Sequence, residues 1–434
     1  HTDGGEAFRR HVRSTSWEAI ERGSGVSRDD IERVAGIYAA SQACVFAWTM
    51  GITHHTHGAD NVRAIANLAL LRGMVGRPHA GLLPIRGHSN VQGIGSVGVT
   101  PKLKHAIFER LESHFGVKLP TSPGMDTLAC MEAMSRGELR NAWCLGGNLL
   151  GSNPDTRSAV EAFSRLNSVT YFSTTLNTGH AWGRAGHTLV LPVRPRDEES
   201  QATTQESMFS FVRISDGGPP RHYGPRSEVE LVAHIASEVL GSDGPINWDA
   251  MKAHGNIRAA IAAVVPGYAA IADVDESRRE FQIAGRTLHE PKFKTSSGRA
   301  QFHITPLPAK NLADNELRLM TIRSEGQFNT VVYEEHDLYR NQDRRDIILI
   351  SEADMARLGL RAEQRITVRS ATGEMSGILV RPFAIKPGNV AMYFPEANVL
   401  VPRTADPESR TPAFKAVRVT LLSQSEALRS RPAD

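Results

Sequence analysis

The sequence predicts an α/β protein in which Rossmann-like parallel-sheet units are followed by a C-terminal, mostly β, barrel-like domain. Strand-like apolar runs alternate with helix-like periodicity over residues 27–192, the order typical of parallel sheets. After Glu316 the pattern changes to short β runs separated by turn residues, which is typical of a small barrel. Because 434 residues exceed what one core ordinarily serves, several domains are expected.

Four regions follow from these patterns. Residues 1–90 are predicted to form part of a first α/β domain, and residues 91–195 part of a second, Rossmann-like domain. Residues 196–310 are less regular and are expected to pack on the α/β domains as a mixed segment. Residues 311–434 are predicted to form the C-terminal β-barrel domain.

The first region predicts a helix, a strand, a loop and a second helix. Ser27 is expected to cap a helix of about three turns. The continuous apolar run 43–50 predicts a strand buried on both faces. A loop over 51–58 follows, and the second helix ends near Gly73. Since open α/β sheets bind ligands at the carboxyl ends of their strands, this loop is a candidate ligand loop.

The same order repeats in the second region. A helix is predicted over 127–134, a strand over 142–145 and a polar loop over 146–154. A second helix begins at Asp155 and is followed by a strand over 169–172, a second polar loop over 173–186 and a strand over 187–192. This pattern predicts a second Rossmann-like unit with two strand-end loops facing one crevice.

The remaining elements complete the prediction. A helix is expected over 229–240 in the mixed segment and another over 351–358 within the barrel. The barrel strands are predicted at residues 317–322, 347–350, 365–368, 376–380, 390–394 and 416–421.

Composition and charge exclude several classes of function. With 40% hydrophobic and 22% charged residues, the chain is globular rather than disordered. A net charge of +3 gives no electrostatic reason to expect nucleic acid as a partner, and no apolar stretch is long enough to span a membrane. Cys44, Cys130 and Cys144 are expected to be buried, reduced thiols, which together with the lack of a signal peptide predicts a cytoplasmic protein. Because the chain begins at His1 without a methionine, we expect a processed chain or a fragment.

The strongest chemical signal lies in the block Pro84-Ile-Arg-Gly-His-Ser-Asn-Val-Gln-Gly93. Glycines leave its backbone bare, and Arg86 offers a planar donor fork that suits carboxylates and phosphates. The competing interpretation is an ordinary surface or salt-bridged arginine, but the polar run after it favours a ligand loop. We therefore expect Arg86 to meet a small anion.

Other polar loops are weaker signals. Asn148 follows two glycines at a strand end, where backbone N–H groups can hold phosphate, although glycine and asparagine are also ordinary turn residues. His54, His55 and His57 suggest a metal, but they lack the partners that zinc sites need, so hydrogen bonding to a ligand or solvent exposure is favoured. No dinucleotide, nucleoside triphosphatase or hydrolase fingerprint is present, which argues against a plain nucleotide-binding α/β enzyme.

At this point the motifs resemble a known family. The sequence is similar, in order from about residue 16 to 421, to the molybdopterin oxidoreductases of the dimethyl sulfoxide reductase family, and most of all to the C-terminal portion of formate dehydrogenase-like alpha subunits. The blocks that carry the resemblance are Met50-Gly-Ile-Thr, Gly-Arg-Pro-His-Ala-Gly81, Pro-Ile-Arg-Gly-His-Ser-Asn-Val-Gln-Gly93, Leu-Gly-Gly-Asn148, Thr-Ser-Ser-Gly-Arg-Ala300, Ile-Arg-Ser-Glu-Gly-Gln-Phe-Asn329 and Tyr-Phe-Pro-Glu-Ala-Asn398.

The resemblance implies roles for individual residues. Arg86 matches the family's active-site arginine, and His88 matches a position beside the pterin, so these two are the expected catalytic residues. The positions that match cofactor-binding ones are Met50, Gly51, His54, Gly87, Gly146, Asn148, Ser152, Thr175, Arg323, Ser324, Gln327, Asn329, Tyr393, Asn398 and Lys415. The loop around Thr175 and the residue at His54 both depart from the usual family pattern. No metal-ligating residue is assigned within the chain.

The resemblance also implies the cofactors and the reaction. Relatives bind two molybdopterin guanine dinucleotides and molybdenum, with residues 311–434 supplying a dinucleotide-binding domain. The metal's protein ligand and the cysteines of a 4Fe-4S cluster are expected in sequence before this chain. We expect the cofactor-binding part of an enzyme that oxidises formate or a similar small anion by two electrons and passes them through an iron–sulfur cluster to an electron-transfer partner. The rival is a catalytically silent fragment or binding module that holds the pterin or a partner without turnover.

Overall fold

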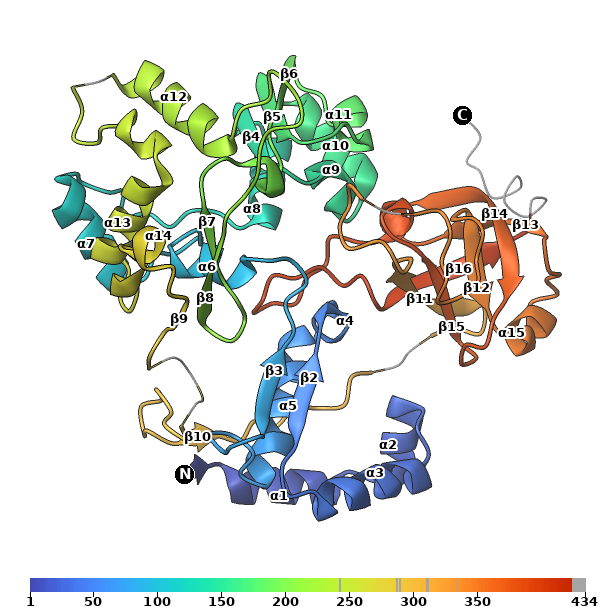
Figure 1. Cartoon of the computed structure of the whole chain (residues 1–434). Helices are drawn as coiled ribbons and strands as arrows, with labels where there is room; N and C mark the ends of the chain where they lie inside the picture. The colour runs from blue at the N-terminus through green and yellow to red at the C-terminus, as the bar shows by residue number, and fades with distance from the viewer. Residues whose placement is uncertain (242, 286–287, 289, 310–311, 333, 424–434) are drawn as a thin grey trace. The chain divides into compact units, whose positions relative to one another are not determined.

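The computed structural model (Figure 1) describes residues 1–241, 243–285, 288, 290–309, 312–332 and 334–423. The chain divides into two compact units. Unit 1 comprises His1–Ile85, Gly285–Ile322 and Arg345–Asp434, and unit 2 comprises Arg86–Ala284 and Arg323–Arg344. The end of the predicted barrel domain, residues 424–434, lies outside the described residues. The predicted fold class, parallel α/β sheets with a C-terminal barrel, is confirmed.

The barrel of unit 1 is closed, with strand order β11-β15-β12-β14-β13-β16. Alternate residues such as Leu317 and Leu319 point inward and are fully buried, which sets the register of each strand. Ser351 caps the one helix between the strands by accepting the N–H of Asp354. The elements are β11 (Glu316–Ile322), β12 (Ile347–Ile350), α15 (Glu352–Arg357), β13 (Arg365–Arg369), β14 (Glu374–Pro382), β15 (Asn389–Tyr393), η4 (Glu396–Leu400) and β16 (Val417–Leu422).

The rest of unit 1 is a small α/β part in which β2 runs parallel to β3. Phe46 and Leu82 face a core with Met74, whereas Val45, on the opposite face, is 52% exposed. The prediction that this strand is buried on both faces was wrong, because β2 pairs with β3 alone among the described strands and helices do not cover Val45. The elements are β1 (Thr2–Asp3), α1 (Gly5–Ser14), α2 (Trp17–Ser24), α3 (Arg28–Ala40), β2 (Val45–Trp48), α4 (Met50–Thr53), α5 (Gly58–Leu71), β3 (Gly81–Pro84) and β10 (Ala300–Gln301).

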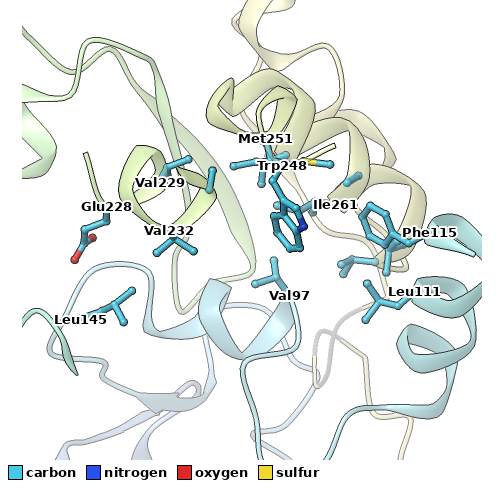
Figure 2. Close-up of a pocket in the computed structure, with 15 residues that line it drawn as sticks. Val97, Leu111, Phe115, Leu145, Glu228, Val229, Val232, Trp248, Met251 and Ile261 are labelled. Atoms are coloured by element: carbon cyan, nitrogen blue, oxygen red, sulfur yellow. The ribbon is translucent and has the colours of Figure 1, made fainter. Parts of the chain in front are cut away.

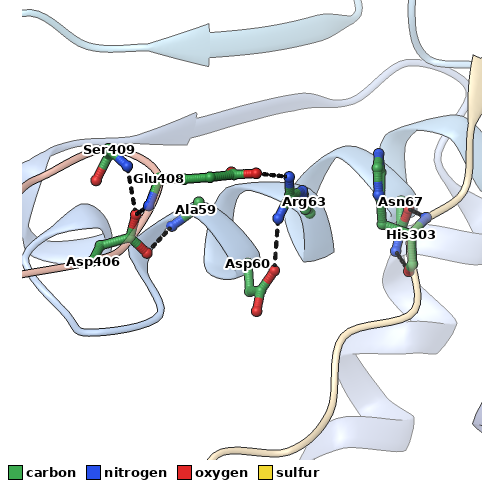
Figure 3. Close-up of polar contacts among 8 residues, drawn as sticks. All are labelled: Ala59, Asp60, Arg63, Asn67, His303, Asp406, Glu408 and Ser409. Carbon is green, nitrogen blue, oxygen red and sulfur yellow. Dashed lines mark hydrogen bonds and ion pairs between the residues drawn. The ribbon is translucent and has the colours of Figure 1, made fainter.

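Polar contacts fix α5 to the segment that precedes β16 (Figure 3). The buried carboxylate of Asp406 accepts the N–H of Ala59 at 3.2 Å, in the first turn of α5, and the N–H of Ser409 at 2.7 Å. An acceptor at that place satisfies one of the four N–H groups that a helix leaves open at its start. Farther along α5, Arg63 lies between Asp60 and Glu408. The start of α5 is thereby held by residues almost 350 positions later.

The core of unit 2 is a parallel sheet of order β4-β5-β6. Phe163 and Val169 are fully buried in this core, and Asp126 and Asp155 cap the flanking helices α8 and α10. Two short helices lie in the strand-end loops where the sequence predicts only polar loop. The elements are α8 (Thr127–Ser135), β4 (Asn141–Leu145), α9 (Leu149–Ser152), α10 (Thr156–Ser164), β5 (Ser168–Ser173), α11 (Thr178–Trp182) and β6 (His187–Pro192).

The remaining part of unit 2 is more regular than expected. An antiparallel sheet β7-β8-β9 packs with α7 and α13 around Val212, Tyr268 and Ile283. The sequence hides this sheet because β7 reads Thr-Thr-Gln-Glu, which has no apolar alternation. The elements are α6 (Val91–Ser96), α7 (His105–Phe115), η1 (Arg196–Glu198), β7 (Thr203–Glu206), β8 (Phe211–Ser215), α12 (Glu228–Leu240), η2 (Ala250–Lys252), α13 (His254–Val264), η3 (Ala269–Ile271), α14 (Val274–Ser277) and β9 (Phe281–Gln282).

The three cysteines are free thiols, but only Cys144 is buried, whereas Cys44 and Cys130 are half-buried. The expectation that all three are buried was therefore wrong for two of them: Cys44 lies just before β2, and Cys130 lies on a partly exposed face of α8. Within the described residues, none of the helices is both long and apolar enough to cross a membrane.

Because Cys144 is buried and Cys44 is only half-buried, their thiols are expected to differ in reactivity. Burial raises the pKa of Cys144 to about 11, because the thiolate would lie in the apolar core beside β5. We expect iodoacetamide to modify Cys144 at least about tenfold more slowly than Cys44 at neutral pH. Mass spectrometry of tryptic peptides measures both rates in one sample, and equal rates would show that the core around β4 opens readily.

Candidate functional site

Two glycines expose the backbone at the carboxyl end of β4. Gly146 and Gly147 both have φ of 67°, a conformation that side chains rarely adopt, and the position where a Cβ would lie faces open space in each case. The N–H of Gly146 is donated to Phe172 of β5 at 2.8 Å, so the glycine turn is fixed to the sheet. The chain therefore offers bare main chain at the edge where α/β sheets bind ligands.

Asn148 connects three segments of unit 2. Its side chain is 4% exposed, accepts the N–H of Gly151 at 2.8 Å, and donates to the hydroxyl of Thr178 at 3.2 Å and to the carbonyl of Thr330 at 3.4 Å. A Cβ at Gly179 would lie 2.3 Å from the Asn148 side-chain oxygen, so a glycine is needed there. Asn148 thus holds the three segments together from a buried position.

The loop after β5 meets the loop after β4. Asn177 caps α11, and its side-chain amide donates to the carbonyl of Gly147 at 3.2 Å. Thr175 is exposed, and its carbonyl accepts the hydroxyl of Ser173 at 2.7 Å. Burial lowers the pKa of His180, which favours its neutral form in the reciprocal cap with Asn177. The two strand-end loops are therefore bonded to each other beyond the carboxyl ends of β4 and β5.

The segment 323–332 forms its own tight loop. Arg323 is exposed and donates to the carbonyl of Phe328 at 3.2 Å, while Ser324 donates to the carbonyl of Glu334 at 3.1 Å. The Asn329 side-chain oxygen accepts the N–H groups of Val331 and Val332 at 2.8 and 2.6 Å. Gln327 is 4% exposed. Thr330 places this loop beside Asn148, so residues predicted from opposite halves of the chain share unit 2.

The loop that carries Arg86 and His88 also belongs to unit 2, and both residues are exposed. The Arg86 guanidinium donates to Gln92 of α6 at 3.3 Å. Gly87 has open space where a Cβ would lie. Ser152, in the cluster around Asn148, is half-buried and donates its hydroxyl back to Leu149 at 3.0 Å.

In unit 1 the structure brings His54 and Lys415 together. The N–H of Lys415 is donated to the carbonyl of His54 at 3.1 Å, and the His54 ring lies 5.2 Å from that of Phe414. The Lys415 ammonium donates to the carbonyl of Thr321 at the end of β11. Met50 and Gly51, in α4, are exposed just before this contact.

Two predicted cofactor residues of unit 1 are fully buried. Tyr393 is 1% exposed and Asn398 is 0% exposed. The Arg345 guanidinium lies 4.9 Å from the centre of the Tyr393 ring. What these two side chains can offer a ligand is therefore support for the backbone around them.

The histidine cluster shows no metal-site arrangement. His55 and His57 have ring centres 5.3 Å apart, and burial, then the neighbouring His57, lowers the pKa of His55. Among the described residues, no group of three or more His, Cys, Asp or Glu side chains is placed to hold a metal ion.

A cavity of about 490 Å³ opens in unit 2 (Figure 2). Apolar side chains of α7, α12 and α13 line it, with Trp248 between them and Leu145 at one side. Glu228 is the one carboxylate in its lining. A cavity of this chemistry suits apolar groups and lacks the donors that phosphates need.

The ionisation of Glu228 is expected to make the stability of the folded protein depend on pH. Although part of its side chain reaches solvent, the apolar surroundings raise its pKa above the usual 4.5. The folded state then holds the proton more tightly, so stability is lost as pH rises from 4.5 through the raised pKa. We expect Glu228→Gln to be more stable than the parent at neutral pH and equal to it below 4.5.

Urea denaturation at both pH values measures this difference. Glu112→Gln is the matched control with the opposite sign, because the N–H of Leu119 lowers the pKa of Glu112. A neutral-pH loss of stability for Glu228→Gln would contradict the assignment.

The comparisons with known proteins decide the family. Residues 36–183 match the family described as "Molybdopterin oxidoreductase", and residues 317–418 match the "Molydopterin dinucleotide binding domain". The chain belongs to the molybdopterin oxidoreductase family. The two matched ranges contain the strand-end loops of unit 2, the α4 region and nearly the whole barrel. The family resemblance predicted from the motifs is confirmed.

Relatives with similar sequences support the assignment of this chain to the molybdopterin oxidoreductases. The chain is 34% identical to an uncharacterised oxidoreductase of Mycobacterium tuberculosis, covering 97% of this chain and 56% of the relative. It is 32% identical to Protein YdeP of Escherichia coli K12, covering 97% and 58%, and 26% identical to Formate dehydrogenase H of the same organism, covering 98% and 62%. The chain thus spans little more than half the length of these relatives.

A solved structure shows the same fold. Acetylene hydratase from Pelobacter acetylenicus matches with a TM-score of 0.65 over 97% of this chain and 66% of that one, at 13% identity. At this identity the likeness concerns the fold of the molybdopterin oxidoreductase and not its reaction.

Sequence reasoning missed the residues that hold the site together. Asn177 contacts Gly147, and Thr178 and Thr330 contact the predicted residue Asn148, but no role was assigned to these three residues from the sequence. Asn177 itself carried a usable signal, because asparagine is among the preferred residues at the start of a helix.

Proposed function

We propose that this chain is the cofactor-binding part of a formate dehydrogenase-like molybdenum enzyme that oxidises formate or a similar small anion by two electrons. Its membership of the molybdopterin oxidoreductases supports an oxidoreductase with a molybdopterin dinucleotide. The likeness to Formate dehydrogenase H favours formate as the first substrate to try. The single observation that carries the proposal is the joined loop surface around Gly146, Gly147 and Asn148, inside the matched family range.

The donor set of this surface fits a dinucleotide. Bare glycine backbone, the exposed Thr175 and the guanidinium of Arg323 offer N–H, hydroxyl and cationic groups to phosphates and a guanine. We assign to this role, in unit 2, Gly87, Gly146, Asn148, Ser152, Thr175, Arg323, Ser324, Gln327 and Asn329. In unit 1 we assign Met50, Gly51, His54, Tyr393, Asn398 and Lys415 to a dinucleotide as well. The bound molybdenum cofactor would supply the two-electron chemistry.

Arg86 and His88 are assigned to the substrate. Arg86 is exposed, and among the described residues its guanidinium donates to the neutral amide of Gln92, so its charge is available to an anion. His88 lies two residues later on the same exposed loop, and we assign to it a hydrogen bond to the substrate beside Arg86. The chain's role is to hold and orient a carboxylate next to the cofactor.

The electron path belongs to the same proposal. The relatives are longer than this chain, so a 4Fe-4S cluster and the metal's protein ligand are assigned to sequence beyond it. An electron-transfer partner would receive the electrons, and the free thiols favour a cytoplasmic location.

Metal and pterin content test the proposal. The chain is expressed alone and within the full-length product of its gene, and molybdenum is measured by mass spectrometry and pterin by fluorescence. We expect both in the full-length protein, together with formate-dependent dye reduction. Cofactor without dye reduction for any small anion would favour a silent binding module, and absence of both would refute the proposal.

A further inference from the structure

The loop that carries Arg86 and His88 is anchored by a sheet that no motif pointed to. Asn90 ends this loop and begins α6 with φ of 63°, a left-handed conformation that asparagine tolerates better than most residues. Its side-chain oxygen accepts the N–H of Glu206 at 3.1 Å. Glu206 is the last residue of β7, so the loop is bonded to the end of a strand.

A glycine makes this contact fit. A Cβ at Gly93 would lie 2.0 Å from the Asn90 side-chain oxygen and 3.2 Å from the Glu206 nitrogen. Gly93 is buried within α6, where an alanine would otherwise be favoured by helix propensity. Gly93 is therefore required because the Asn90 side chain lies so close to it, and not because its own backbone dihedral angles demand a glycine.

Arg196 supplies a second anchor. Its guanidinium donates to the side chain of Gln205 at 2.9 Å and to the hydroxyl of Ser89 at 3.3 Å. Gln205 precedes Glu206 in β7, so both anchors end on adjacent residues of one strand. Ser89 and Asn90 directly follow His88, which leaves the proposed substrate residues little freedom.

The strand that receives both anchors is itself rigid. Glu206 is 2% exposed, pairs with Val212 of β8, and its carboxylate accepts the hydroxyl of the buried Tyr268. Val212 is 1% exposed in the core of this sheet. Hydrogen bonds to such a strand therefore restrain the position of the loop.

We propose that Asn90 and Arg196 are positioning residues that hold the Arg86 loop against β7 and so set where Arg86 and His88 meet the substrate. The part that concerns substrate rests on the proposed function, whereas the anchoring of the loop does not. Neither residue touches the substrate in this scheme. Gly93 permits the contact, and Gln205 and Glu206 receive it.

Hydrogen exchange on the chain as given tests the anchoring without any cofactor. Asn90→Gly keeps the left-handed backbone but removes the acceptor, whereas Asn90→Asp keeps an acceptor oxygen. We expect amides of residues 86–93 and of Glu206 to exchange at least about tenfold faster in Asn90→Gly, with Asn90→Asp near the parent. Unchanged exchange in Asn90→Gly would overturn the proposal.

A double-mutant cycle gives an independent test. Gly93→Ala should displace the Asn90 side chain and raise the same exchange rates about tenfold. In Asn90→Gly/Gly93→Ala the clashing oxygen is absent, so the second substitution should add little to the first. Additive effects would show that Gly93 acts through something other than Asn90 and would contradict the scheme.

Kinetics of the full-length protein separate this proposal from the proposed function. We expect Asn90→Gly and Arg196→Gln to raise KM for formate about 10- to 100-fold, with cofactor content and thermal unfolding unchanged and Asn90→Asp restoring most of the affinity. If the protein shows no turnover at all, the proposed function fails while the exchange data still decide the anchoring. Fast exchange with unchanged KM would overturn the positioning role.

Discussion

Replacing Arg86 by alanine in the full-length protein is expected to lower formate-dependent turnover by about 100- to 1000-fold while leaving molybdenum and pterin content unchanged. The reason is that Arg86 presents its guanidinium at the surface of the loop and bonds the neutral Gln92, so its removal takes away a cation without exposing a core. Dye-reduction assays on samples with matched metal content measure the change.

Two variants sharpen this result. Arg86→Lys keeps the charge but loses the planar donor fork, so it should recover only part of the activity. Arg110→Ala removes an exposed arginine from α7 and should leave turnover at the parent level. Normal turnover in Arg86→Ala would remove Arg86 from the substrate site.

Replacing Arg345 by alanine is expected to destabilise unit 1 by about 3–5 kcal/mol. The Arg345 side chain is 7% exposed, donates to both carboxylate oxygens of Glu396 at 2.6 and 3.0 Å, and donates to the carbonyl of Phe394 at 2.6 Å. Its removal leaves a partly buried carboxylate and a carbonyl without their donor. Urea denaturation, followed by a spectroscopic signal of the barrel, measures the loss.

The double variant and a surface pair serve as controls. Arg345→Ala/Glu396→Gln should be less destabilised than the sum of its two single variants, because the uncompensated charge is gone. Arg28→Ala breaks a pair whose side chains are 54% and 51% exposed, and it should cost no more than about 0.5 kcal/mol. An equal loss at both sites would show that Arg345 is not part of the barrel's support.

The barrel could be predicted well because its determinants are local. Each strand carries apolar residues that alternate or run continuously between turn signals, and Ser351 marks the start of its helix. The strand β3 was missed because Gly81-Leu-Leu-Pro84 is short and contains the two residues that most oppose strands. Its position is set by pairing with β2, which sequence periodicity does not contain.

The candidate site was predictable only in part, for a related reason. Glycine-rich loops at strand ends are visible in a sequence, which is how Gly146 and Asn148 were found. The partners are not, because Asn90 meets Glu206 across 116 positions and Asn148 meets Thr330 across 182. Such pairs depend on the tertiary fold. The assignments of the site residues and of the four domain boundaries stay predictions.

The bond between Asn148 and Thr330 has a consequence for biosynthesis. Unit 2 is interrupted in the sequence. Its second segment, Arg323–Arg344, is synthesised after residues 285–322, which belong to unit 1 and include β11. At about 5–20 residues per second, the ribosome delivers Thr330 roughly 10–40 s after Asn148. During that interval the loops after β4 and β5 are without one of their fixed neighbours. On the proposed function, the loop surface assigned to the dinucleotide lacks Thr330 until residues 323–344 have been made, so we expect cofactor insertion to follow the synthesis of β11.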